Sequence, residues 1–166
     1  MKNIVLIGMP GCGKTTVGKY LAKALEFEFI DCDRVIEETE GTSISNIFAE
    51  HGESYFRCLE TKTLERLSTA ENAVIATGGG CVERRENFEI LKKSGTVVFV
   101  NRPLENILGD VDTSKRPLLA DGKERLFELS KRRMPLYKEV CDIEISNTTP
   151  PKKLVQKIID EVKKNG

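Results

Sequence analysis

Short apolar runs alternate along the chain with segments whose apolar residues recur every three or four positions. The short runs predict strands at residues 3–7, 27–30, 73–77, 96–100 and 142–145, and the continuous apolar run at 3–7 is typical of a strand buried on both faces. The periodic segments predict a helix from Lys14, further helices near 33–39, 43–50, 53–69, 84–93, 103–108 and 122–133, and a last one that starts at Pro150 or Pro151. Strands that alternate with helices indicate an α/β fold, in which a parallel sheet is covered on both faces.

We expect one domain over residues 1–166, since the chain has the length of an ordinary domain and shows no repeat or low-complexity linker. Ligands of such folds gather at the carboxyl ends of the strands. Polar residues that directly follow the predicted strands are therefore the first candidates for function.

Composition narrows the classes of ligand. The 26 basic and 26 acidic residues balance, so no general affinity for nucleic acid or for an anionic membrane is expected. The first apolar run is too short for a signal peptide, and five widely spaced cysteines without a Cys-x-x-Cys pair argue against a disulfide framework or a zinc site. We therefore expect a cytoplasmic protein whose anionic ligands are held by local groups.

The segment Gly8-Met9-Pro10-Gly11-Cys12-Gly13-Lys14-Thr15 matches the phosphate-loop pattern G-x-x-x-x-G-K-[ST] at every fixed position. It lies between a predicted buried strand and a predicted helix, as its mechanism requires. Backbone N–H groups of such a loop surround phosphate oxygens, and the helix adds its positive end. Lys14 is then expected to bridge the β- and γ-phosphates, and the Thr15 hydroxyl to bind Mg²⁺. The alternative is a chance match in a glycine-rich turn, which would not need a buried strand before it and a helix after it.

Asp31 and Asp33 follow the second predicted strand. One of them can hold a water bound to Mg²⁺ while the other accepts a hydrogen bond from a substrate hydroxyl. Aspartates also cap helices, and Asp31 is suited to cap the helix that follows. The pattern is compatible with both interpretations.

Four further features suggest an anion site. The Gly78-Gly79-Gly80 segment after a buried strand permits close backbone approach and leaves N–H groups free for a ligand. Arg57 is a clamp for a carboxylate, a solvated surface residue or an ion-pair partner. Arg116 lies in a polar stretch, where it either closes over ATP or faces solvent. Arg132 and Arg133 are either anion contacts or a basic helix end that favours the helix dipole.

In this order and at these separations, the motifs resemble the shikimate kinase family, a group of nucleoside monophosphate kinase-like phosphate-loop proteins, over essentially the whole chain. The resemblance rests on the phosphate loop and on five shorter segments: Asp31-Cys32-Asp33, Phe56-Arg57-Cys58-Leu59-Glu60, Thr77-Gly78-Gly79-Gly80, Arg116-Pro117-Leu118-Leu119 and Arg133-Met134-Pro135-Leu136-Tyr137.

The resemblance implies a five-stranded parallel sheet of order 2-3-1-4-5 and a cytoplasmic, largely monomeric enzyme of aromatic amino acid biosynthesis. It implies transfer of the γ-phosphoryl group of ATP to the 3-hydroxyl of shikimate, with a shikimate-binding region near 31–60 and a mobile lid near 109–121. Shikimate would be held by Asp33, Arg57, Gly79 and Arg133, with Gly78 and Gly80 beside it. The ATP phosphates would be bound by Gly11, Cys12, Gly13, Lys14, Thr15 and Thr16. Thr15 would ligate Mg²⁺, Asp31 would reach the ion through water, and Lys14, Asp33 and Arg116 would be catalytic.

One departure from the family concerns adenine. The family often has an arginine about seven residues before the lid arginine, and Gly109 stands there; an arginine often found near the start of the last helix is also missing. Packing on adenine is therefore expected to differ.

The alternative functions are another small-metabolite kinase of this fold, such as a gluconate or nucleoside monophosphate kinase, and a non-catalytic binding module. No Asn/Thr-Lys-x-Asp segment for reading guanine is present, which argues against a GTPase.

Overall fold

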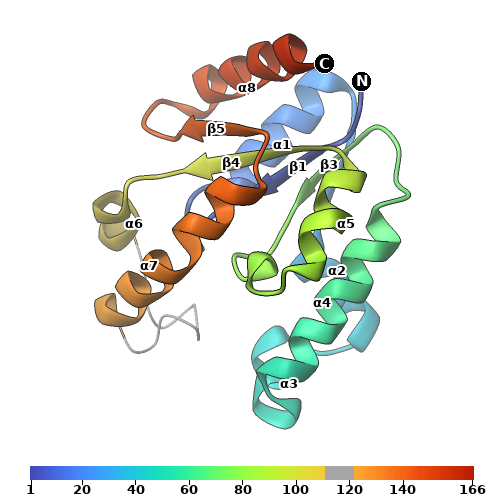
Figure 1. The fold of residues 1–166 in the computed structure, drawn as a ribbon, viewed down its shortest axis with the longest axis vertical. Coiled ribbons are helices and arrows are strands. Elements are labelled where there is room, and N and C mark those ends of the chain that lie inside the picture. The colour runs from blue at the N-terminus through green and yellow to red at the C-terminus, as the bar shows by residue number, and fades with distance from the viewer. Residues whose placement is uncertain (111–121) are drawn as a thin grey trace.

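The computed structural model describes residues 1–110 and 122–166, and a five-stranded sheet forms its centre (Figure 1). The strands in sequence order are β1 (Ile4–Ile7), β2 (Glu28–Asp31), β3 (Ala73–Ala76), β4 (Thr96–Asn101) and β5 (Ile143–Ser146). Their order in space is β2-β3-β1-β4-β5, and all neighbouring strands are parallel. The α/β class predicted from the apolar pattern, and the strand order implied by the family resemblance, are both confirmed.

Helices cover both faces of the sheet. They are α1 (Lys14–Leu25), α2 (Cys32–Glu40), α3 (Ile44–His51), α4 (Glu53–Leu67), α5 (Glu86–Ser94), α6 (Leu104–Asp110), α7 (Lys123–Val140) and α8 (Pro151–Asn165). α1 and α8 pack together on one face, whereas α5 and α7 pack against strands from the other (Figure 1). In the described part of the chain, none of these helices has the length and apolar character needed to cross a membrane.

The segment from α2 to α4 forms a group of its own beyond the end of β2 (Figure 1). A small apolar cluster of Ile36, Ile47 and Phe56 holds its three helices together, separately from the main core. The side chain of Ser43 accepts a hydrogen bond from the Asn46 amide and caps α3, as the sequence indicated. The predicted shikimate-binding region, residues 31–60, falls on this group.

The central strand β1 organises the main core. Its four residues are completely buried, and it pairs with β3 on one side and β4 on the other. Since all the strands run parallel, the segments that follow them emerge at one edge of the sheet: the phosphate loop after β1, α2 after β2, Thr77 after β3 and Arg102 after β4. This edge is where ligands of the fold are expected.

Helix α7 differs most from the prediction. The helix was predicted near 122–133, and this end was wrong: the helix continues through Pro135 to Val140. Proline removes one hydrogen bond from the helix interior, which is costly. Complete burial of Tyr137 and Val140 offsets this cost by packing the last turns into the core.

Two smaller differences concern local segments. A short 3-10 helix, η1 (Cys81–Glu83), follows the three glycines and was not predicted. Gly109 and Asp110, expected to begin the lid, belong to α6 instead. The rest of the predicted lid, residues 111–121 with Arg116, lies outside the described residues.

Asn3 locks the start of β1 to two neighbouring segments. Its buried side-chain amide donates hydrogen bonds to the carbonyls of Ala70 and Ser94, at 2.6 and 3.0 Å, and its side-chain oxygen accepts one from the Ala73 amide at 3.0 Å. One polar side chain thus pairs backbone groups just before β3, at the start of β3 and at the end of α5.

Replacement Asn3→Ala should leave these backbone groups without partners and lower the free energy of unfolding by roughly 2–4 kcal/mol. Urea denaturation measures the change, with Asn46→Ala as a control at an exposed position. A loss no larger than that of the control would contradict the assigned role.

Candidate active site

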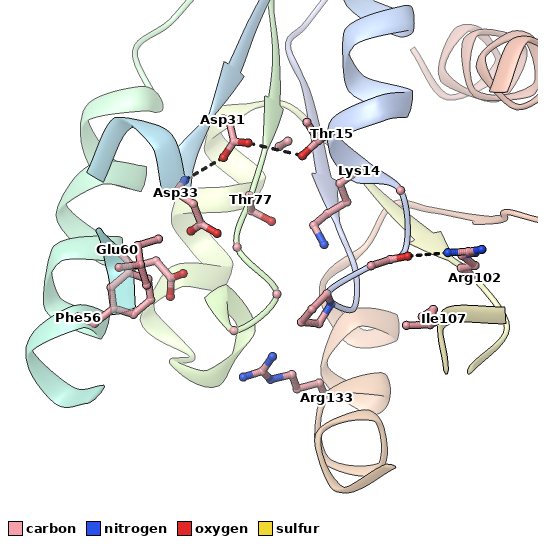
Figure 2. A pocket seen from close by; sticks show the side chains of 18 of the residues that line it. Lys14, Thr15, Asp31, Asp33, Phe56, Glu60, Thr77, Arg102, Ile107 and Arg133 are labelled. Atoms are coloured by element: carbon pink, nitrogen blue, oxygen red, sulfur yellow. Dashed lines mark hydrogen bonds between the residues drawn. The ribbon is translucent and has the colours of Figure 1, made fainter. Parts of the chain in front are cut away.

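The carboxyl edge of the sheet encloses a cavity of about 740 Å³ (Figure 2). The phosphate loop lines one side, and α2, α4, the three glycines and α7 line the other. The cavity brings together nearly all of the residues predicted from the sequence: Gly11, Gly13, Lys14, Thr15, Thr16, Asp31, Asp33, Arg57, Gly78, Gly79, Gly80 and Arg133. Cys12 does not line it, because its side chain is buried behind the loop.

The phosphate loop turns around the Lys14 ammonium group. Gly13, with a φ of +100°, makes the turn into α1, a conformation that glycine adopts without strain. The Lys14 Nζ atom donates hydrogen bonds to the carbonyls of Gly8 at 2.6 Å and Met9 at 3.0 Å. A buried cation thus lies at the centre of the loop, beside the positive end of α1, where a phosphate group is stabilised.

Asp31 uses its two carboxylate oxygens in different ways. Oδ1 accepts hydrogen bonds from the backbone amides of Asp33 and Arg34, at 3.0 and 3.4 Å, and so caps α2. Oδ2 lies 3.5 Å from the Thr15 hydroxyl across the mouth of the phosphate loop (Figure 2). The capping interpretation is confirmed, and it leaves the second oxygen facing the residue predicted to bind the metal.

This pair is compatible with Mg²⁺. The ion prefers oxygen ligands and usually keeps several waters while it is bound by one or two protein groups and by substrate phosphates. The Thr15 hydroxyl and the Asp31 oxygen have this chemistry and lie next to the loop that would hold the phosphates.

Asp33 and Glu60 point toward each other across Gly78. A Cβ atom on Gly78 would lie 2.8 Å from Asp33 Oδ1 and 2.9 Å from Glu60 Oε2, so only glycine fits between the two carboxylates. Both oxygens are buried and have no hydrogen-bond partner among the described residues. Burial, and next the charge of Asp31, raise the pKa of Asp33 to about 6, although Lys14 opposes the shift.

Arg57 is buried rather than solvated. Its Nη1 atom donates to Glu60 Oε1 at 3.0 Å, its Nη2 atom lies 3.3 Å from Glu53 Oε1, and its Nε atom has no partner among the described residues. The expectation of a solvated surface residue is therefore wrong, whereas the alternative of an ion-pair partner is confirmed. A buried guanidinium held on two sides by carboxylates faces the cavity.

Arg133 reaches the cavity from α7 (Figure 2). It is 2% exposed, and its Nε atom donates to Glu83 Oε1 at 3.0 Å. Its Nη1 atom is buried without a partner in the described part of the chain. One turn further along α7, the Tyr137 hydroxyl donates to the Gly79 carbonyl at 2.5 Å and ties the helix to the glycine segment.

Sequence reasoning missed Arg102, which follows β4 directly. Its Nη1 atom donates to the Gly11 carbonyl at 3.0 Å (Figure 2), and its guanidinium also pairs with Asp110. Arg102 lines both the main cavity and a neighbouring one of about 410 Å³ that extends to Asn147 and Pro151. The rule that singled out Asp31, a charged residue at the end of a buried strand, applies equally to Arg102.

Glu60 and Glu83 were missed for a different reason. Both are acidic residues outside the predicted set of site residues, and the fold brings Glu83 against Arg133, 50 residues further along the chain. A sequence signal existed for Glu60 alone, because it lies three residues after Arg57 on a predicted helix.

The fold and this cavity define a phosphate-loop kinase whose acceptor side is built from arginines and carboxylates. Comparison with known proteins is more specific: the model of the shikimate kinase family matches residues 10–163. The chain belongs to this family. Its predicted enzyme class, an ATP-dependent phosphotransferase with an alcohol group as acceptor, is confirmed.

Individual relatives resemble the chain over nearly its whole length. A shikimate kinase of Clostridium botulinum is 47% identical over 99% of this chain and 97% of its own. A shikimate kinase of Acinetobacter baumannii, solved in complex with shikimate, has a TM-score of 0.95 and 40% identity, covering 99% of this chain and 94% of the other. The enzyme of Aquifex aeolicus has a TM-score of 0.87 and 38% identity, with coverage of 98% and 97%.

We expect Glu60 to make stability depend on pH. Burial raises its pKa to about 7 from an ordinary value of 4.5, although the ion pair with Arg57 opposes the shift. Between these values the folded chain binds a proton that the unfolded chain releases, so folding becomes less favourable as pH rises through this window. Glu60→Gln should remove this fall, on the order of 1–3 kcal/mol.

Urea denaturation of both proteins at pH 5 and pH 7.5 measures the effect. The variant should gain stability relative to the natural chain at the higher pH. Glu65→Gln, an exposed change on the same helix, is the control. An equal difference between Glu60→Gln and the natural chain at the two pH values would contradict the expectation.

Proposed function

We propose that this enzyme transfers the γ-phosphoryl group of ATP to the 3-hydroxyl of shikimate, giving shikimate 3-phosphate and ADP. One observation carries the proposal: a single cavity holds a complete phosphate loop on one side and two buried arginines with an aspartate on the other. Phosphoryl transfer depends on positioning and charge neutralisation, which such an arrangement supplies.

The acceptor side suits a small hydroxylated acid. Arg57 and Arg133 each have a buried nitrogen without a partner among the described residues, and guanidinium groups pair well with a carboxylate. Asp33 would accept a hydrogen bond from the attacking hydroxyl and orient it. Its pKa of about 6 leaves it mostly ionised at neutral pH, so it can also take the proton. The glycine segment would let the ring of the acid approach the backbone closely.

On the donor side, the loop from Gly11 to Thr16 would hold the ATP phosphates. Lys14 would neutralise charge on the transferring group, and Arg102 would contact the nucleotide beside the loop. Thr15, together with Asp31 through a water, would hold Mg²⁺, which supplies further neutralisation of the phosphate oxygens. Arg116 would add positive charge from the predicted lid; it lies outside the described residues, so this role stays a prediction.

We also propose that the enzyme works as a cytoplasmic monomer of one domain. One chain carries the phosphate loop and the acceptor residues in the same cavity, so no second copy is needed to complete them. All five cysteines lie in the described part of the chain and are free thiols, as suits a reducing compartment.

A nucleotide acceptor is less compatible with this cavity. It would need an apolar pocket for its base, whereas the acceptor side places two guanidinium groups and two carboxylates around the glycines. A coupled assay of ADP release with shikimate, quinate, gluconate and nucleoside monophosphates tests the choice. We expect turnover with shikimate alone. Turnover with another acceptor would favour a different kinase, and ATP binding without ADP release would favour a non-catalytic module.

Replacement Lys14→Ala should lower kcat by a factor on the order of 10²–10⁴, because a cation at the centre of the phosphate loop is lost. Steady-state kinetics measures the change, and Lys19→Ala, exposed on the same helix, is the control. A folded Lys14→Ala enzyme with the natural kcat would refute this role.

Replacement Arg57→Ala should raise the KM for shikimate by roughly 10- to 100-fold and change the KM for ATP much less, since charge-assisted hydrogen bonds are worth about 1.5–3 kcal/mol. Arg34→Ala is a matched control, because its side chain is 77% exposed. An unchanged KM for shikimate would remove the carboxylate clamp from the mechanism.

A further inference from the structure

A carboxylate outside the predicted motifs holds Arg133. Glu83 Oε1 accepts hydrogen bonds from two consecutive arginines of α7, from Arg132 Nε at 2.9 Å and from Arg133 Nε at 3.0 Å. The two arginines differ in their surroundings: the side chain of Arg132 is 48% exposed, whereas that of Arg133 is 2% exposed and lines the cavity. Glu83 itself does not line the cavity.

The local fold holds Glu83 rigidly at this place. It ends η1, which continues directly from the glycine segment, and its amide donates to the Gly80 carbonyl at 3.0 Å. The buried side chain of Asn87 donates to the Cys81 carbonyl at 2.8 Å and fixes the start of the same turn. A residue on a short, doubly anchored segment can set the position of a long side chain that contacts it.

The contact between Glu83 and Arg133 is selective. A guanidinium group has one Nε donor and two Nη groups, arranged in a plane. Glu83 takes the Nε donor and leaves the Nη1 atom buried with no partner among the described residues. In Figure 2 the guanidinium of Arg133 extends from α7 toward the glycine segment and α4.

We propose that Glu83 is a positioning residue that fixes the Arg133 guanidinium by its Nε atom, so that the Nη groups face the carboxylate of the acceptor. This role rests on the proposed function, in which Arg133 binds that carboxylate. Burial alone would raise the pKa of Glu83, but the hydrogen bonds from Arg132 and Arg133 outweigh it and lower the pKa, so Glu83 carries its charge at neutral pH. With one negative charge between two guanidinium groups, the cluster keeps a net positive charge.

The negative charge of Glu83 and its contact with Arg133 predict opposite changes in shikimate affinity when the carboxylate is removed. A negative charge near the site repels an anionic substrate, so its removal alone would strengthen binding of the acid. Loss of a positioning contact would weaken binding, because Arg133 would no longer be held in the orientation that suits the carboxylate. The direction of the change in shikimate affinity therefore separates the two effects.

The test measures shikimate affinity and turnover for Glu83→Ala, Glu83→Gln and Glu83→Asp. Calorimetric titration with shikimate gives Kd, and the ADP-release assay gives kcat and both KM values. We expect Glu83→Ala to weaken shikimate binding on the order of tenfold, with the KM for ATP unchanged. Glu83→Gln keeps an acceptor of the same length and should stay within about threefold of the natural enzyme. Glu83→Asp keeps the charge but shortens the side chain, and should resemble Glu83→Ala.

Arg132→Ala is the matched control, since it removes the exposed partner of the same oxygen and should leave shikimate affinity nearly unchanged. Thermal melting identifies any variant that does not fold. If Glu83→Ala does not fold, the shikimate Kd of Glu83→Asp is compared with that of Glu83→Gln. Weaker binding by Glu83→Asp would then support the positioning role. Unchanged or stronger shikimate binding in the folded Ala or Asp variant would overturn the proposal.

Arg133→Ala distinguishes this proposal from the proposed function. If Arg133→Ala weakens shikimate binding and the Glu83 variants do not, only the positioning role fails. If the natural enzyme does not respond to shikimate, or Arg133→Ala binds it normally, the assigned carboxylate site itself fails. When both roles hold, the double variant Glu83→Ala, Arg133→Ala should bind shikimate no more weakly than Arg133→Ala alone.

Discussion

The site depends on the parallel pairing of β1 with β3 and β4. This pairing buries β1 completely and brings the ends of four strands to one edge of the sheet. Residues far apart in sequence, such as Lys14, Asp31, Thr77 and Arg102, thereby meet around one cavity. An antiparallel arrangement would send alternate strand ends to opposite edges and separate the phosphate loop from the acceptor residues.

Burial of several charges at this edge requires that they compensate one another. Lys14 is held by backbone carbonyls, Arg57 by Glu60 and Glu53, and Arg133 by Glu83. The partners of Arg57 and Arg133 leave one buried nitrogen of each guanidinium without a hydrogen bond among the described residues. The unpartnered atoms of Asp33, Arg57, Glu60 and Arg133 all belong to residues that line the cavity. A substrate with one carboxylate and several hydroxyl groups offers partners for such atoms, which connects the cost of burying them to substrate recognition.

The two sides of the cavity are built by different means. On the donor side, one continuous segment, the phosphate loop with the start of α1, holds most of the groups. The acceptor side is assembled from α2, α4, the glycine segment and α7, with η1 behind it. Contacts between these elements, such as Tyr137 with Gly79 and Arg133 with Glu83, therefore decide its geometry.

Local sequence was sufficient for the elements and motifs that rely on short-range physics. The apolar run at β1, the amphipathic pattern of α8 and the phosphate loop could all be read directly, because neighbouring residues specify them. Other features depended on the assembled fold. Contacts between residues more than 20 positions apart decide the roles of Arg102 and Glu83. Burial decides the continuation of α7 through Pro135 and the environments of Arg57 and Glu60. Free energies of burial and of long-range ion pairs are set by the assembled fold, and they override local preference where the two conflict.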